Sequence, residues 1–263
     1  MVIIDELRCF ISALLLTCGV SAADDFDHLS GAGTNKPLDE LSFSNTLKWD
    51  REYLNYARRQ TRYLRLDWKR SFALPAPPAN SSARTKAELD YLEQLLATRP
   101  SRKKEIEAEV LVSKFRWGNF TYKELTESEN LEKTGILMRA VYRDLGVVCF
   151  TFKLRYNRVR PSILAANMGR EVKTVVAIPG HPAYPSGHAT GAFTIAYILQ
   201  ELDPNNAETY REDALRIAQN REVGGLHYPS DTKAGRILAR QIADSLLANP
   251  RFQQLLKAAR SEW

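Results

Sequence analysis

Three short polar segments near the C-terminal end of the chain constrain this sequence more than any other feature. They span residues 153–161, 185–188 and 221–231. Cationic side chains can bind the oxygens of a tetrahedral oxyanion while one imidazole attacks the central atom and another donates a proton. The residues that suit such chemistry are one lysine, two arginines, two histidines, one aspartate and a Ser-Gly pair: Lys153, Arg160, Ser186, Gly187, His188, Arg221, His227 and Asp231.

The spacing of these residues is K-x6-R-P, P-S-G-H and R-x5-H-x3-D. It resembles the type 2 phosphatidic acid phosphatase (PAP2) superfamily, which includes bacterial class A non-specific acid phosphatases, lipid phosphate phosphatases and vanadium haloperoxidases. The class A enzymes are the most similar group, because the proline-rich segment 74–79 and the tail 231–256 also resemble theirs. Residues 98–145 match nothing specific. The resemblance implies an all-α, single-domain helical bundle of the PAP2/haloperoxidase type, and an acid phosphatase that hydrolyses phosphomonoesters through a phosphohistidine intermediate.

The Pro-Ser-Gly-His segment predicts a helix start that binds an anion. With Pro185 at the first helical position, Ser186, Gly187 and His188 fall in the first turn, where backbone N–H groups have no intrahelical partner. Gly187 lets an oxyanion approach the backbone closely, and Ser186 adds a hydroxyl donor. Three cations are expected to complete the phosphate-binding set: Lys153, Arg160 and Arg221.

His227 is the predicted nucleophile. A neutral imidazole nitrogen can attack phosphorus when its other nitrogen donates to a carboxylate, here Asp231. Pro229 predicts the start of the last long helix, with His227 just before it and Asp231 in its first turn. His188 is the expected general acid, which protonates the leaving alkoxide and later activates water. The resemblance implies the same three catalytic roles.

Several neighbouring polar residues depart from the motif or lie outside it. Arg155 and Arg158 lie between the motif positions, and we expect both to be surface charges. Asn220 stands where related sequences usually have serine. His181 precedes the Pro-Ser-Gly-His segment, and we expect it to be an exposed loop histidine.

The charge of the chain is compatible with phosphate binding. The formal net charge is +6 and the pI is near 9.2. The basic run 58–65 predicts a solvated helix face rather than a nucleic-acid site. No cluster of carboxylates, cysteines and histidines has metal-ligand spacing, so we expect no metal, no cofactor and small-molecule phosphate esters as substrates.

The N-terminal residues predict export. Residues 1–22 combine a short apolar stretch with small residues at its end and read as a signal peptide, followed by a flexible leader at 23–40 and the catalytic domain at 41–263. The expected location is therefore periplasmic or secreted. No later stretch approaches the roughly 18 apolar residues of a membrane span, so stable membrane insertion is not expected. A homo-oligomer remains open.

Helical periodicity dominates the domain. One strand is predicted at 172–178, where β-branched residues gather. The proline-rich segment 74–79 ends any preceding helix. Helices are predicted at 41–69, 85–97, 102–114, 127–158, 185–202, 206–220 and 229–248.

Three other functions remain to be weighed. A vanadate-dependent haloperoxidase would use the same cage, because vanadate mimics phosphate, but such enzymes are generally longer. A lipid phosphate phosphatase without membrane spans would need a surface-binding mode, which the sequence does not indicate. A protein that only binds phosphate needs neither the His227–Asp231 pair nor His188.

Overall fold

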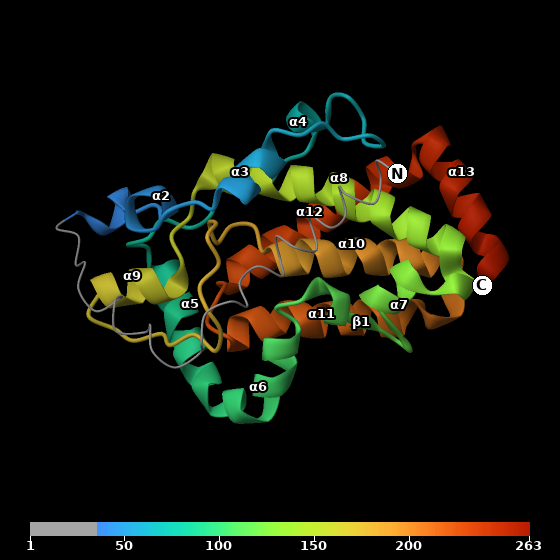
Figure 1. Ribbon diagram of the computed structural model, residues 1–263. Helices are drawn as coiled ribbons and strands as arrows, with labels where there is room; N and C mark the ends of the chain where they lie inside the picture. Colours follow the sequence, from blue (N-terminus) through green and yellow to red (C-terminus); the bar gives the residue numbers. More distant parts are fainter. Residues whose placement is uncertain (1–35) are drawn as a thin grey trace.

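The computed structural model describes residues 36–263, and these are predominantly helical (Figure 1). The all-α prediction is confirmed, with one small sheet in which β1 and β2 pair antiparallel. The predicted signal peptide and residues 23–35 of the leader lie outside the described residues. The two strands are β1 (Arg116–Trp117) and β2 (Phe120–Thr121).

Shorter elements surround the long helices. The shorter α-helices are α2 (Phe43–Thr46), α3 (Arg51–Ala57), α4 (Trp68–Ser71), α5 (Ala83–Gln94), α6 (Arg99–Ala108), α7 (Tyr122–Glu127), α9 (Pro161–Asn167) and α13 (Pro250–Ala259). The 3-10 turns are η2 (Leu38–Glu40), η3 (Leu95–Thr98), η4 (Val112–Lys114), η5 (Glu129–Leu131), η6 (Pro204–Asn206) and η7 (Arg260–Glu262).

Four long helices form the bundle: α8 (Glu132–Tyr156), α10 (Gly187–Leu202), α11 (Ala207–Val223) and α12 (Pro229–Leu247). Helix α10 is the central one, because it contacts the other three and almost all of its side chains are buried (Figure 1). The predicted motifs lie in the last turns of α8 and α11 and at the starts of α10 and α12. The topology therefore brings all three motifs to the same end of the bundle.

Helix α10 approaches α12 closely at Gly235. A Cβ atom there would lie 2.7 Å from the Ser186 carbonyl oxygen and 2.8 Å from the Ala189 Cβ. Gly191 differs, because its Cβ would meet only Tyr142, at an ordinary contact distance of 3.6 Å. Glycine at Gly235 thus lets α12 pack against the start of α10, where Ser186 lies.

The two glycines predict opposite effects on stability. Gly235→Ala is expected to lower the free energy of unfolding by about 1–3 kcal/mol, the usual cost of overpacking a core. Gly191→Ala, the control in the neighbouring helix, should leave it unchanged or raise it by up to about 1 kcal/mol, because alanine restricts the unfolded chain. Denaturant unfolding of both variants checks this, and equal destabilisation would contradict the close approach.

The predicted helix at 41–69 is wrong. That segment forms α2, α3 and α4, joined by loops, because its backbone bonds to distant parts of the chain instead of to itself. The Asp50 N–H donates to the Gly180 carbonyl, and the Arg62 and Tyr63 N–H groups donate to the buried carboxylate of Asp144 on α8. The basic run 58–65 therefore lies mostly in a loop, not on a helix face.

Three further boundaries differ from the predictions. Residues 172–178, the predicted strand, form an irregular segment without ladder pairing. The predicted helix at 127–158 begins at residue 132, after η5, and ends where Asn157 adopts a left-handed conformation with φ of 47°. Residues 38–40, the end of the predicted leader, form the turn η2, and their backbone accepts hydrogen bonds from Asn80, so they pack on the domain. Among residues 36–263, no helix combines the length and the apolar character needed to cross a bilayer.

Candidate active site

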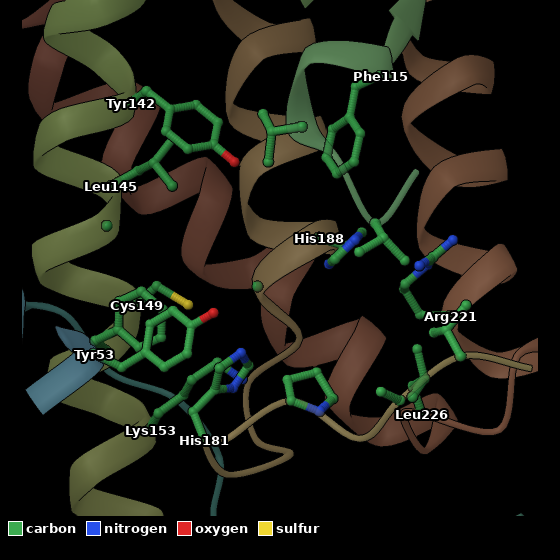
Figure 2. A pocket seen from close by; sticks show the side chains of 18 residues that line it. Tyr53, Phe115, Tyr142, Leu145, Cys149, Lys153, His181, His188, Arg221 and Leu226 are labelled. Atoms are coloured by element: carbon green, nitrogen blue, oxygen red, sulfur yellow. The ribbon is translucent and has the colours of Figure 1, made fainter. Parts of the chain in front are cut away.

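The structure brings all eight predicted site residues together. Gly187 lies against Lys153, since a Cβ on the glycine would be 3.7 Å from the lysine Cε. Ser186 donates its backbone N–H to the Asp231 carbonyl at 3.0 Å. Four of the eight also line a cavity of about 80 Å³ at this end of the bundle: Lys153, Gly187, His188 and Arg221 (Figure 2). The other four, Arg160, Ser186, His227 and Asp231, are buried beside these residues but are not part of the lining.

The start of α10 differs from the prediction by two residues. Helix α10 begins at Gly187, and Ser186 is its N-cap, because the serine backbone is extended and its Oγ accepts the Ala189 N–H at 3.3 Å. Pro185 therefore precedes the cap instead of occupying the first helical position. The N–H groups of Gly187 and His188 remain first-turn donors without intrahelical acceptors.

A tight turn after α11 positions His227. Gly225 has φ of +72°, in the left-handed region, and a Cβ there would collide with the Lys173 carbonyl. The chain folds back on the helix end, so that the N–H groups of Leu226 and His227 both donate to the Arg221 carbonyl. Pro229 then opens α12, as predicted, and places Asp231 in its first turn.

His227 and Asp231 form a buried pair. His227 Nδ1 lies 3.2 Å from Asp231 Oδ2, and Arg160 NH1 lies 3.2 Å from His227 Nε2. Because a guanidinium only donates, Nε2 must accept and the imidazole proton must reside on Nδ1. Burial, followed by the charge of Arg160, lowers the pKa of His227 to about 3. The imidazole is therefore neutral at mildly acidic pH, with its Nε2 lone pair unprotonated.

Arg158 is the main residue that the sequence analysis misjudged. It is 4% exposed, not a surface charge, and its NH1 donates to Asp231 Oδ1 at 2.6 Å. Its NH2 reaches Glu88 at 3.2 Å, and its guanidinium lies over the Tyr228 ring. Burial alone would raise the pKa of Asp231, but Arg158 and then the hydrogen bond with His227 hold it at about 2. Arg155, in contrast, is exposed as predicted.

Arg221 has donors that no described residue uses. Its NH2 donates to Glu109 at 2.8 Å and to the Ile106 carbonyl at 3.0 Å. Its Nε and NH1 are buried and have no hydrogen-bond partner among residues 36–263. Buried guanidinium donors without an acceptor are costly, and an anion in the adjacent cavity would satisfy them.

Glu109 was not found from the sequence, because it follows a highly charged helix, α6, that carries no motif. It is 4% exposed and also accepts hydrogen bonds from Asn220 Nδ2, at 2.9 and 3.0 Å. The asparagine that departs from the family pattern thus helps to fix the carboxylate that holds Arg221. Burial raises the pKa of Glu109 to about 7 despite these two partners. The Glu109 carbonyl also lies 2.9 Å from His188 Nε2.

Lys153 and Arg160 bind backbone carbonyls beside the cavity. Lys153 Nζ donates to the Pro182 carbonyl at 2.7 Å, and burial lowers its pKa to about 7. Arg160 donates to the carbonyls of His181 and Leu226, and its NH2 lies 3.0 Å from His181 Nδ1. His181 is therefore not the exposed loop histidine that was predicted. It lines the cavity, and burial keeps its pKa well below the ordinary value (Figure 2).

Comparison with known proteins agrees with this arrangement. Residues 137–247, which contain all three motifs, match the PAP2 superfamily. A non-specific acid phosphatase of Providencia stuartii is 31% identical over 42% of this chain and 45% of its own length. An acid phosphatase of Zymomonas mobilis is 30% identical over 55% of this chain and 52% of its own length. The chain thus spans about half the length of the curated relatives that it matches.

A solved structure shares the fold. The crystal structure of the first bacterial vanadium-dependent iodoperoxidase superposes with a TM-score of 0.58, over 82% of this chain and 63% of that one, at 16% identity. The fold is therefore of the PAP2/haloperoxidase type, and the relationship to the PAP2 superfamily that the motifs predicted is confirmed.

Proposed function

We propose that this protein is an acid phosphatase that hydrolyses phosphomonoesters through a phosphohistidine on His227. The observation that carries the proposal is the pair of buried Arg221 donors that have no acceptor within residues 36–263, at a cavity that Lys153 and His188 also line. Their geometry suits the equatorial oxygens of a transferring phosphoryl group. The similarity to acid phosphatases of two bacteria supports the same reaction class.

In the first half-reaction, His227 Nε2 attacks phosphorus, and an N–P bond forms as the ester P–O bond breaks. In the structure, Arg160 NH1 donates to the Nε2 lone pair that must attack. The bound phosphate therefore has to take over as the acceptor of Arg160, which frees Nε2 for the reaction. Asp231, held by Arg158, stabilises the cationic imidazole that results. His188 gives a proton to the leaving alkoxide. Its pKa lies well below the ordinary value because of burial and then Arg221, and the negative charge of a bound phosphate raises it.

In the second half-reaction, water attacks phosphorus, gives its proton to His188, and the N–P bond breaks to release inorganic phosphate. The cations of the site compensate the negative charge of the phosphoryl group, and this supports a mechanism without a divalent metal. The proposed location remains periplasmic or secreted, on the basis of the predicted signal peptide.

The direct test is the hydrolysis of p-nitrophenyl phosphate. We expect turnover at mildly acidic pH, unchanged by EDTA and inhibited by vanadate, which occupies the same cage. His227, whose pKa is about 3, should remain a competent neutral nucleophile as the pH falls through 5 and 4, and lose activity only as it gains a proton below that range. Loss of activity on chelation, restored by zinc or magnesium, would contradict the metal-free mechanism. Halide oxidation by vanadate and peroxide without ester hydrolysis would favour a haloperoxidase instead.

A further inference from the structure

The cavity beside the candidate catalytic residues has two chemically distinct parts. Its polar part contains Lys153, Arg221, His181 and His188. Its remaining wall is apolar and aromatic, and Figure 2 shows Tyr142, Leu145 and Phe115 at the end away from Lys153 and His181. A phosphoryl group at the polar part would therefore direct the organic part of its ester towards this apolar wall.

The apolar wall is rigidly built. Phe115 and Leu145 are at most 3% exposed, and the Phe115 ring lies 5.0 Å from the His188 ring. On the opposite side, Tyr53 stacks on Phe150 with ring centroids 4.8 Å apart. Both contacts connect the wall to the core of the bundle. The apolar surface is thus preformed, as in most small-molecule sites.

The mouth of the cavity lies between two irregular segments. Val110, in the loop after α6, and Val176, in the segment predicted as a strand, both line the cavity and are only partly buried. An organic group that enters here meets valine side chains before it reaches the aromatic rings. The mouth and the wall therefore both favour an apolar organic group.

Apart from the lysine, arginine and histidines of its polar part, the described lining offers a hydroxyl-rich organic group few side-chain hydrogen-bond partners, chiefly the hydroxyls of Tyr53 and Tyr142. Among the described lining residues there is no aspartate, glutamate, asparagine, glutamine, serine or threonine. Burying sugar hydroxyls without partners costs roughly 1–3 kcal/mol each, whereas apolar surface gains about 25 cal/mol for each Å² removed from water.

We propose that the cavity binds the organic group of the phosphomonoester, and that this group is apolar, such as a benzyl or branched alkyl group. The proposal rests on the phosphatase function and names its substrate class. Sugar phosphates, glycerol phosphates and nucleotides are poor substrates in this account.

The test compares benzyl phosphate with glycerol 1-phosphate. Both are esters of primary alcohols, and glycerol is the better leaving group, so a faster reaction of the benzyl ester reports binding rather than intrinsic reactivity. We expect kcat/KM to be at least about tenfold higher for benzyl phosphate, the scale on which apolar pockets discriminate. A ratio near one or below it would overturn the proposal.

Adjacent valines provide a matched pair of variants. Val176→Asn should lower the benzyl-to-glycerol ratio about fivefold, because it places an amide at the mouth. Val175→Asn is the control: Val175 is also partly buried but is not part of the lining, and the ratio should be that of the wild type. Val110→Asn, on the other side of the mouth, should act like Val176→Asn, and thermal unfolding confirms that each variant is folded.

The outcomes distinguish a failure of the proposed apolar pocket from a failure of the proposed phosphatase function. Hydrolysis of both esters without preference, or equal effects of the two adjacent valine variants, would contradict the apolar pocket alone. Hydrolysis of p-nitrophenyl phosphate but of neither alkyl ester would contradict the apolar pocket alone, whereas hydrolysis of none of the three would contradict the phosphatase function, and with it this proposal.

Discussion

Replacing His227 by alanine is expected to lower kcat for p-nitrophenyl phosphate by at least about 10⁴-fold, the scale seen when the nucleophile of a cooperating set is deleted. The reason is the tautomer that Asp231 and Arg160 impose, because it leaves Nε2 as the only unprotonated nitrogen of His227. The variant should still bind phosphate or vanadate, since the cations of the site are intact. Steady-state kinetics and vanadate binding measure the two effects separately.

His181→Ala is the matched control for the nucleophile. His181 lines the cavity and, like His227, contacts Arg160, but most of that contact is made by its backbone carbonyl. Alanine keeps the carbonyl, so we expect a loss of only about tenfold. If His181→Ala lost as much activity as His227→Ala, or if His227→Ala retained near-normal turnover, the assignment of the nucleophile would be contradicted.

Arg158→Met is expected to lower kcat by roughly 10²-fold, although Arg158 touches no reacting atom in the proposed mechanism. Arg158 is a positioning residue: it fixes and ionises the carboxylate that orients the His227 imidazole. Without the guanidinium, burial raises the pKa of Asp231 from its value of about 2, so the acid limb of the kcat profile should move to higher pH. A pH profile of the variant measures this shift, which a loss of packing alone would not produce.

Two variants of the same segment complete that test. Arg158→Lys keeps a positive charge and should restore part of both the rate and the profile. Arg155→Met removes an exposed charge three residues away and should change neither. Arg158→Met should also lower the free energy of unfolding by about 3–5 kcal/mol, because it removes the buried cation that pairs with two buried carboxylates, Asp231 and Glu88. An unchanged pH profile in Arg158→Met would contradict the positioning role.

The sequence predicted the parts of the site that local chemistry determines. Proline favours the first position of a helix, and Pro229 occupies that position in α12. The placement of His227 before α12 and of Asp231 within it could therefore be predicted from the local sequence. The burial of Arg158 could not be read in this way. Its acceptors, Glu88 and Asp231, lie 70 and 73 residues away, and nothing adjacent to the arginine distinguishes it from exposed Arg155.

The same limit explains the other differences. The aromatic periodicity of residues 41–69 is compatible with one helix, but Asp144 and Gly180 compete for its backbone N–H groups from distant parts of the chain. Residues 172–178 have β-branched side chains but pair with no strand among residues 36–263, and two of them, Val176 and Ala177, line the cavity instead. Periodicity reports which residues can be buried, whereas the partners that bury them are set by the whole fold.

The measurement that tests the central claim most directly is rapid acid or base quench of the enzyme mixed with radiolabelled phosphomonoester, followed by peptide mapping. The account predicts that label appears on the protein within the first turnover, is lost in acid but kept in base, and maps to the peptide that contains His227. It also predicts no labelled protein in His227→Ala. Label on Ser186, or label bound to the His227→Ala variant, would contradict the mechanism.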